Sequence, residues 1–340
     1  MAGRPRRRKP TLDLAARPGH IAPMHVTTSW TGLPPEARGG SVALGNFDGV
    51  HRGHAAVVAV ARAARPDATL SVLTFEPHPR ELFRPDDPPF HLTLPPERDR
   101  LLAGLGVAVV HQIPFDRAFS WIGADGFVEQ VLHDGIGAAH VVCGPDFAFG
   151  HRRGGDVALL IERCERLGIG VTVAPHLVDE AGVISSTRIR RLLQDGYPER
   201  AASLLGRDWA IEGVVAHGDA RGRTLGFPTA NVPLGRHLEP QRGVYAVRVA
   251  LPGGAVVEGV ANIGRRPTVG GTESRVEAHL FDWAGDLYGQ GVRVGLVAFL
   301  RDERKFDGLD ALKTQIALDS AEARSILALT PAAREPIAMP

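Results

Sequence analysis

Two histidines in a glycine-rich turn are the residues best placed by the sequence to do chemistry. His51 and His54 end the segment Gly-Asn-Phe-Asp-Gly-Val-His-Arg-Gly-His, which begins at Gly45. An apolar run at 41–44 precedes it and an alanine-rich helical pattern at 55–64 follows, so the segment is predicted to join a strand to a helix. A helix N-terminus offers free N–H groups and the positive end of the helix dipole. The turn therefore favours a nucleotide triphosphate.

The turn has neither the Walker pattern nor the Gly-x-Gly-x-x-Gly fingerprint of dinucleotide binding. A lone histidine at a helix start more often caps the helix than binds a ligand. Two histidines framed by three glycines and Asp48 favour the ligand instead.

A second phosphate clamp is predicted at Ile-Ser-Ser-Thr-Arg-Ile-Arg, residues 184–190. Ser186 and Thr187 stand before an amphipathic helix, and Arg190 follows one turn later. Hydroxyls at a helix start and a nearby guanidinium both bind phosphate oxygens. Alone, the same pattern fits an ordinary N-cap with a solvated basic face.

Two loops that follow predicted strands are further candidates for ligand contact in the first half of the chain. Glu-Pro-His-Pro-Arg stiffens a loop that presents His78, and Gly-Pro-Asp-Phe-Ala-Phe-Gly presents Asp146 and Phe147. Loops at strand ends commonly carry ligand contacts, and aromatic rings suit a planar ligand.

The second half contains a glycine-rich segment that ends in Phe-Pro-Thr-Ala-Asn. Gly218, Gly222 and Gly226 let backbone N–H groups approach phosphates, while Thr229 and Asn231 alternate onto one side of an extended chain. Their two oxygens suit Mg²⁺. A glycine-rich hairpin with no ligand fits the composition as well.

The spacing of apolar residues predicts a fold of class α/β plus β. Strands at 41–45, 69–75, 107–113, 140–143 and 170–174 alternate with helices at 55–64, 96–104, 123–134 and 156–167, which is typical of a doubly wound parallel sheet. Short alternating strands at 209–215, 243–250, 255–260, 275–281 and 292–299 predict a small antiparallel β-barrel, followed by a C-terminal helix from 309. We expect a basic, disordered arm at 1–38, domains at 39–195 and 208–328, a linker at 196–207 and a tail at 329–340.

Composition limits the partners of the chain. Lysines and arginines number 39 against 38 acidic residues, so no global charge attracts nucleic acid, and we expect no such partner. No apolar run approaches the length of a membrane span, and we expect no membrane partner. Two cysteines, Cys143 and Cys164, suit a reduced, cytoplasmic protein. The oligomeric state, including a homo-oligomer, stays open.

The histidine turn and the Ile-Ser-Ser-Thr segment together resemble the two signatures of nucleotidylyltransferases. The second half resembles riboflavin kinase in Gly-Arg-x-Leu-Gly-Phe-Pro-Thr-Ala-Asn, in Asn-Ile-Gly-Arg-Arg-Pro-Thr from Asn262 and in Val-Glu-Ala-His-Leu-Phe from Val276. In this order, over about residues 40–325, the motifs are similar to those of the bacterial bifunctional riboflavin kinase/FAD synthetase family.

This resemblance implies a nucleotidylyltransferase domain that converts FMN to FAD and a kinase domain that converts riboflavin to FMN, with ATP as co-substrate and Mg²⁺. Glu277 would be the base of the kinase, where Thr229 and Asn231 would bind the magnesium nucleotide with the three glycines. His51 and His54 would be catalytic in the other domain. There, ATP would be bound by Gly45, Phe47, Asp48, His51, His54, Ser186, Thr187 and Arg190, and the flavin by His78, Asp146 and Phe147.

One departure and two alternatives accompany this interpretation. Many members of the family have Asn at the position of Asp146 and Arg at that of Ala148, and an acid near ATP phosphates repels them unless it binds a cation or a ribose.

A nucleotidylyltransferase for another precursor leaves the Thr229, Asn231 and Glu277 pattern unexplained. A flavin-binding regulatory protein with a nucleic-acid arm has no need of both histidines and Glu277 together.

Overall fold

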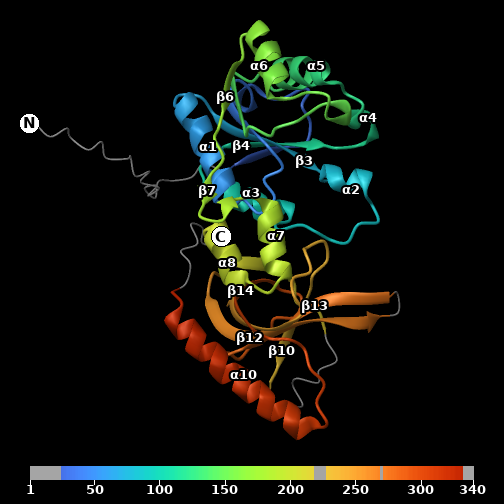
Figure 1. Ribbon diagram of the computed structural model, residues 1–340, viewed down its shortest axis with the longest axis vertical. Coiled ribbons are helices and arrows are strands. Elements are labelled where there is room, and N and C mark those ends of the chain that lie inside the picture. The colour runs from blue at the N-terminus through green and yellow to red at the C-terminus, as the bar shows by residue number, and fades with distance from the viewer. Residues whose placement is uncertain (1–23, 218–226, 269–270, 332–340) are drawn as a thin grey trace, which may run out of the picture.

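The computed structural model describes residues 24–217, 227–268 and 271–331. Two sheets lie at opposite ends of an elongated molecule, and two helices, α7 (Ser186–Gln194) and α8 (Pro198–Leu205), lie between them (Figure 1). Each half of the chain has its own sheet, as the change in sequence pattern predicts.

The first sheet is parallel throughout, in the order β1-β4-β3-β2-β5-β6. Its strands are β1 (His25–Thr27), β2 (Ser41–Leu44), β3 (Leu70–Glu76), β4 (Val109–Pro114), β5 (His140–Cys143) and β6 (Gly170–Val173). The strand order reverses between β2 and β5, and ligands of such sheets gather beyond the carboxyl ends of the strands at that point. The loops predicted to bind substrate follow β2, β3 and β5.

Helices cover both faces of this sheet, which confirms the doubly wound prediction. Separate apolar clusters fill the two faces, one beneath α1 and α3 and the other beneath the π-helix η2 and α6. The helices are α1 (Arg52–Ala64), α2 (Pro79–Phe83), α3 (Pro95–Gly104), α4 (Arg117–Ser120), α5 (Ala124–Gly126), η2 (Phe127–Gly135) and α6 (Val157–Arg166), with 3₁₀ turns η1 (Pro35–Ala37) and η3 (His151–Arg153). A small hairpin of β7 (Val178–Asp179) and β8 (Gly182–Val183) precedes α7.

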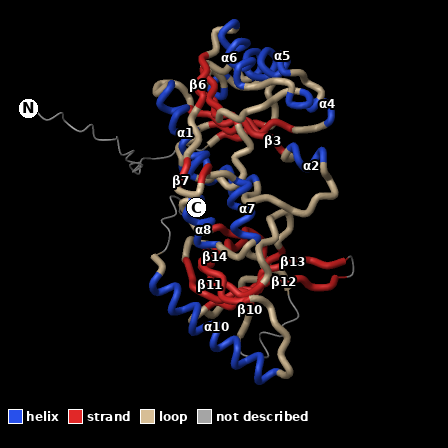
Figure 2. The backbone as a smooth tube through the Cα atoms, viewed as in Figure 1, coloured by secondary structure: helices blue, strands red, loops and turns tan. Residues whose placement is uncertain are grey.

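The second sheet is antiparallel and curls on itself, as Figure 2 shows. Its order is β10-β13-β12-β11-β14-β9, with β9 (Trp209–Val214), β10 (Thr229–Pro233), β11 (Gly243–Ala250), β12 (Val256–Thr268), β13 (Gly271–Leu280) and β14 (Gly291–Arg301). A bridge between Ala216 and Asn231 joins the two edges. The long helix α10 (Leu309–Leu329) packs along the outside, where Ala323 and Leu327 are buried against the sheet.

Two expected segments differ from the structure. We expected a disordered arm as far as residue 38, yet β1 pairs in register with β4 as an edge strand. We expected a linker at 196–207, yet α8 forms there and buries Ala201, Leu204 and Leu205 in a core cluster that also contains barrel residues. Burial of apolar side chains against both neighbours explains why this segment is helical. The expected domain limits stay predictions.

Candidate active sites

His51 and His54 cap the start of α1 together. His51 is the N-cap, and its Nδ1 accepts the backbone N–H of His54 at 3.2 Å, while His54 Nδ1 accepts that of His51 at 3.3 Å. Because both Nδ1 atoms are acceptors here, each neutral ring must carry its proton on Nε2. The capping pair thus turns two imidazoles into two Nε2–H donors.

The two rings are stacked, with centroids 3.6 Å apart, and burial keeps them neutral. Burial lowers the pKa of His51 to about 4, although Asp48 opposes this shift. Burial, followed by the proximity of His51, lowers the pKa of His54 well below its ordinary value. A neutral donor can be aimed at phosphate without a proton being taken up first.

A cavity of about 230 Å³ opens beside this pair and brings together both predicted signatures. Ser186 and Arg190 enter it from α7, because Ser185 caps that helix by accepting the N–H of Arg188 at 3.3 Å and Ile189 is buried beneath it. The residues that line the cavity are Asn46, Asp48, His54, His78, Arg80, Phe90, Ser186 and Arg190.

Asp48 organises this cavity. Its Oδ1 accepts the backbone N–H groups of Leu92 and Thr93, at 2.9 and 3.0 Å, and its Oδ2 pairs with Arg190. Arg190 also donates through Nε to the Phe90 carbonyl at 2.8 Å. Asp48 therefore fixes Arg190 in place and does not meet a phosphate as an unpaired negative charge.

Other predicted residues lie around the cavity but do not line it. Phe47 is buried in the core beneath α1, and its contact with ATP stays a prediction. A Cβ on Gly45 would lie 3.3 Å from the Phe47 ring, so these two residues are closely packed. His51 stacks on His54, and Thr187 follows Ser186 on α7.

Asp146 and Phe147, predicted to contact flavin, lie after β5 and do not line this cavity. The Asp146 carboxylate is exposed and lies 2.9 Å from His176 Nε2. Phe147 packs on Phe149, with ring centroids 5.5 Å apart. The contact of Asp146 and Phe147 with flavin stays a prediction.

Three lining residues were not among the predicted site residues. Asn46 and Arg80 lie inside motifs that the sequence already marked, so their nearness in sequence to His51 and His78 was a signal. Phe90 has no such signal, because it reaches the cavity only when its segment packs beside Arg80 and Arg190, whose guanidinium carbons lie 4.4 and 5.4 Å from its ring centroid.

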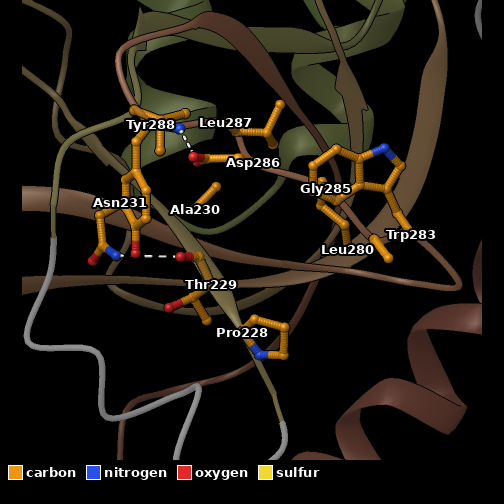
Figure 3. Close-up of a pocket in the computed structure, with 12 residues that line it drawn as sticks. Pro228, Thr229, Ala230, Asn231, Leu280, Trp283, Gly285, Asp286, Leu287 and Tyr288 are labelled. Carbon is orange, nitrogen blue, oxygen red and sulfur yellow. Dashed lines mark hydrogen bonds between the residues drawn. The ribbon is translucent and has the colours of Figure 1, made fainter.

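The curled sheet contains two further cavities that share Thr229 as a lining residue. The first, of about 430 Å³, is lined by β10 and by the loop that follows β13 (Figure 3). Thr229 and Asn231 both face it, and the Asn231 amide nitrogen donates to the Thr229 carbonyl at 3.4 Å, which leaves the amide oxygen for a ligand. Trp283 and Tyr288 add aromatic surface to the same cavity.

The second cavity, of about 490 Å³, lies between β10, β12, β13 and α10 and contains Glu277. The register of β10 on β13 places Asn231 opposite Glu277 and Thr229 opposite His279. Arg266 Nε donates to Glu277 Oε1 at 2.6 Å and so orients the carboxylate.

Several residues of this second cavity were not predicted from the sequence. Arg301 and Asp319 form two hydrogen bonds, with nitrogen–oxygen distances of 2.9 and 2.7 Å, which join β14 to α10 in one wall of the cavity. Asp319 reaches the cavity wall because α10 packs against the sheet, and no sequence motif predicts this position. The predicted Gly218, Gly222 and Gly226 lie outside the described residues.

Comparison with known proteins assigns the family. A family model described as FAD synthetase matches residues 33–188, and one described as riboflavin kinase matches residues 205–327. The bifunctional riboflavin kinase/FMN adenylyltransferase of Escherichia coli (strain K12) is 44% identical over 289 residues, which are 84% of this chain and 92% of that protein. This chain belongs to the bifunctional riboflavin kinase/FMN adenylyltransferase family. It is an enzyme with both activities, an FAD synthetase in its N-terminal domain and a riboflavin kinase in its C-terminal domain.

Two further similarities agree with this family. The bifunctional riboflavin kinase/FMN adenylyltransferase of Bacillus subtilis (strain 168) is 37% identical over 310 residues, which are 88% of this chain and 96% of that protein. A crystal structure from Streptococcus pneumoniae, described as a macrolide-efflux protein, is 35% identical with a TM-score of 0.78 over 88% of this chain and 98% of that one, and it shares the two-domain fold. Within the described ranges, no helix has the length and apolar character to cross a membrane.

Proposed function

We propose that FMN adenylylation takes place in the cavity between α1 and α7. An oxygen of the FMN phosphate attacks the α-phosphorus of ATP, a new P–O–P bond forms, and the bond to pyrophosphate breaks. His54 and, across the cavity, Arg190 donate to the triphosphate, and His51 fixes the His54 ring. Ser186 lines the same cavity, and its hydroxyl donates to the Asp48 carbonyl at 2.8 Å. A neutral Nε2–H and a guanidinium stabilise the charge that develops on the departing pyrophosphate.

We propose that riboflavin phosphorylation takes place where the two cavities of the curled sheet meet. ATP occupies the cavity beside Trp283, and riboflavin occupies the cavity beside α10. The Glu277 carboxylate accepts the proton of the ribityl 5′-hydroxyl as its oxygen bonds to the γ-phosphorus, and ADP leaves. The observation that supports this most is Thr229, which lines both cavities and so marks a place where two substrates can touch.

The residues at this junction fit a magnesium ion. The Thr229 hydroxyl and the Asn231 amide oxygen are two neutral oxygen donors on one face of β10. Mg²⁺ commonly takes one or two protein oxygens and completes its shell with phosphate and water. When bound, it would neutralise charge on the β- and γ-phosphates.

The test of the proposed function is a chromatogram of flavins. Purified protein incubated with riboflavin, ATP and Mg²⁺ is expected to give FMN first and then FAD, and FMN with ATP and Mg²⁺ is expected to give FAD directly. Omitting Mg²⁺ and adding EDTA should abolish FMN formation. Riboflavin that stays unchanged with Mg²⁺ present would overturn the kinase assignment, and FMN that never becomes FAD would overturn the other.

A further inference from the structure

A loop of the kinase domain reaches the wall of the adenylyltransferase site. The loop follows β10 and includes Arg236 and His237. The His91 N–H donates to the Arg236 carbonyl at 3.3 Å, and the Leu238 N–H donates to the His91 carbonyl at 2.8 Å, so residues 91 and 237 form a parallel bridge between the domains. In Figure 1 the segment after α2 runs back toward the second domain.

The Arg236 side chain continues this contact by binding two carboxylates. Its Nε and Nη2 donate to the two oxygens of Glu81 at 3.0 and 2.8 Å, and Nη2 donates also to Glu76 at 2.9 Å. A guanidinium and a carboxylate joined through two bonds fix each other in direction as well as distance. One cation from the kinase domain thus holds two acids of the first domain.

Glu81 in turn fixes His78. The His78 N–H donates to Glu81 Oε2 at 3.0 Å, and His78 Nδ1 accepts the Arg80 N–H at 3.1 Å, so these residues form the cap of α2. His78 and Arg80 line the adenylyltransferase cavity. Because α2 spans only five residues and buries none of them, its cap and its neighbours must hold it in place.

We infer that Arg236, a residue of the kinase domain, is a positioning residue for FMN adenylylation. It acts through Glu81 on His78 and does not line the adenylyltransferase cavity. The inference rests on the proposed site for FMN adenylylation and on our expectation from the sequence that His78, which lines its cavity, binds the flavin. A shift of about 1 Å in a positioning group can cost about 100-fold in rate, so we expect Arg236→Ala to reduce kcat/KM for FMN adenylylation by at least about tenfold.

The matched control is Arg265→Ala. Arg265 binds Glu239 through two nitrogens, at 3.0 and 2.6 Å, and both pairs are exposed to a similar degree, but Arg265 and Glu239 lie within the kinase domain. Full-length Arg236→Ala should raise KM for FMN more than KM for ATP, with riboflavin phosphorylation within about twofold of the parent rate. Arg265→Ala should leave FMN adenylylation at the parent rate.

Two further variants make the test decisive. Arg236→Lys retains the charge and should recover part of the lost FMN adenylylation. The double variant Glu81→Gln/Arg236→Ala should adenylylate FMN no more slowly than the slower of the two single variants, because both changes break the same chain of contacts. If Arg236→Ala does not fold, Arg236→Lys is used instead, and the rate of FMN adenylylation is compared with the rate of riboflavin phosphorylation in that variant. Equal loss of both activities, or FMN adenylylation that matches Arg265→Ala, overturns the inference.

His78→Ala separates this inference from the proposed site. A large loss of FMN adenylylation in His78→Ala with no loss in Arg236→Ala would reject the role of Arg236 alone. Unchanged FMN adenylylation in His78→Ala would reject the placement of FMN at His78 as well.

Discussion

The ring of His54 presents two different nitrogens, and each has a separate duty. Nδ1 accepts the backbone N–H of His51 and completes the helix cap, while Nε2–H is the atom proposed to donate to the triphosphate. The two duties can be separated because Asn and Gln side chains reproduce one each: Asn places an oxygen near the position of Nδ1, and Gln places its amide near that of Nε2.

We therefore predict that His54→Asn loses more FAD formation than His54→Gln. Removal of a single donor to developing charge commonly costs about 100- to 1,000-fold in kcat, and this loss is expected for Asn, with Gln retaining much more activity. The measurement is the initial rate of FAD formation from FMN, with riboflavin phosphorylation as the internal control. A His54→Asn variant that retains more FAD formation than His54→Gln would show that the cap, and not the donor, is what the reaction needs.

Glu277 is the other residue whose role can be isolated. We predict that Glu277→Gln slows riboflavin phosphorylation by about 100- to 10,000-fold, the usual contribution of a general base, and leaves FMN adenylylation unchanged. Glu273→Gln is the control, since Glu273 lies on the same strand, is paired with Arg275 at 2.7 Å and lines neither cavity. Phosphorylation at the parent rate by Glu277→Gln would remove the base assignment.

At the scale of elements, the start of α1 and its neighbour α7 set the protonation of the site. Burial, the Arg190 guanidinium from α7 and Arg207 all act against a positive charge on His51 and His54, whereas Asp48 and a backbone hydrogen bond favour one on His51. Burial is the largest of these effects on the pKa of each ring. The arrangement therefore keeps both rings neutral, whereas exposed imidazoles ordinarily gain a proton near pH 6.5.

We predict that the rings of His51 and His54 stay neutral as the pH falls from about 8 to about 5.5, with the proton on Nε2. A lowered pKa means that protonation begins only as the pH falls toward about 4 for His51. Nitrogen-15 NMR of histidine-labelled protein, with resonances assigned by the His51→Asn and His54→Asn variants, measures both the tautomer and the titration. A midpoint near the ordinary histidine pKa for either ring would show that burial does not control it.

The limits of sequence-based prediction are also clearest at this scale. Periodicity located β2, β5 and β11 to within about one residue, because buried strands read as apolar runs. It missed β1, whose three residues are stable only as an edge against β4, and α8, whose buried face becomes evident only with both domains present. Likewise Ser186 and Arg190 were predictable from a local motif, but Phe90 and Asp319 come from distant segments and depend on packing.

At the scale of the whole molecule, the two domains share a buried polar interface. Arg100 of α3 pairs with Glu212 of β9 at 2.8 Å across it. Glu97, on the same helix, is 2% exposed, and burial raises its pKa to about 8, although Arg207 opposes the shift. Among the described residues, its Oε2 has no hydrogen-bond partner.

We predict that Glu97→Gln stabilises the protein and that the gain grows between about pH 5 and about pH 8. Over this range the unfolded chain has an ionised Glu97 and the folded chain a neutral one, so the folded state binds more protons and loses stability as the pH rises. At about 1.4 kcal/mol per pH unit, the gain over the parent approaches about 4 kcal/mol near the top of the range. Urea unfolding of the parent and of Glu97→Gln, at both ends of this pH range and at its middle, measures the difference in their free energies of unfolding. Because the histidines are common to both proteins, a gain that does not change with pH would reject the neutral Glu97.

The central claim is that one chain holds two separate reaction sites that act in sequence, and mixing two inactive variants tests it most directly. With riboflavin, ATP and Mg²⁺, Glu277→Gln alone should form little FMN and His54→Asn alone should stop at FMN. Because FMN made at one site is substrate at the other, the mixture should form FAD. A mixture that forms no more FAD than either variant alone would contradict the account.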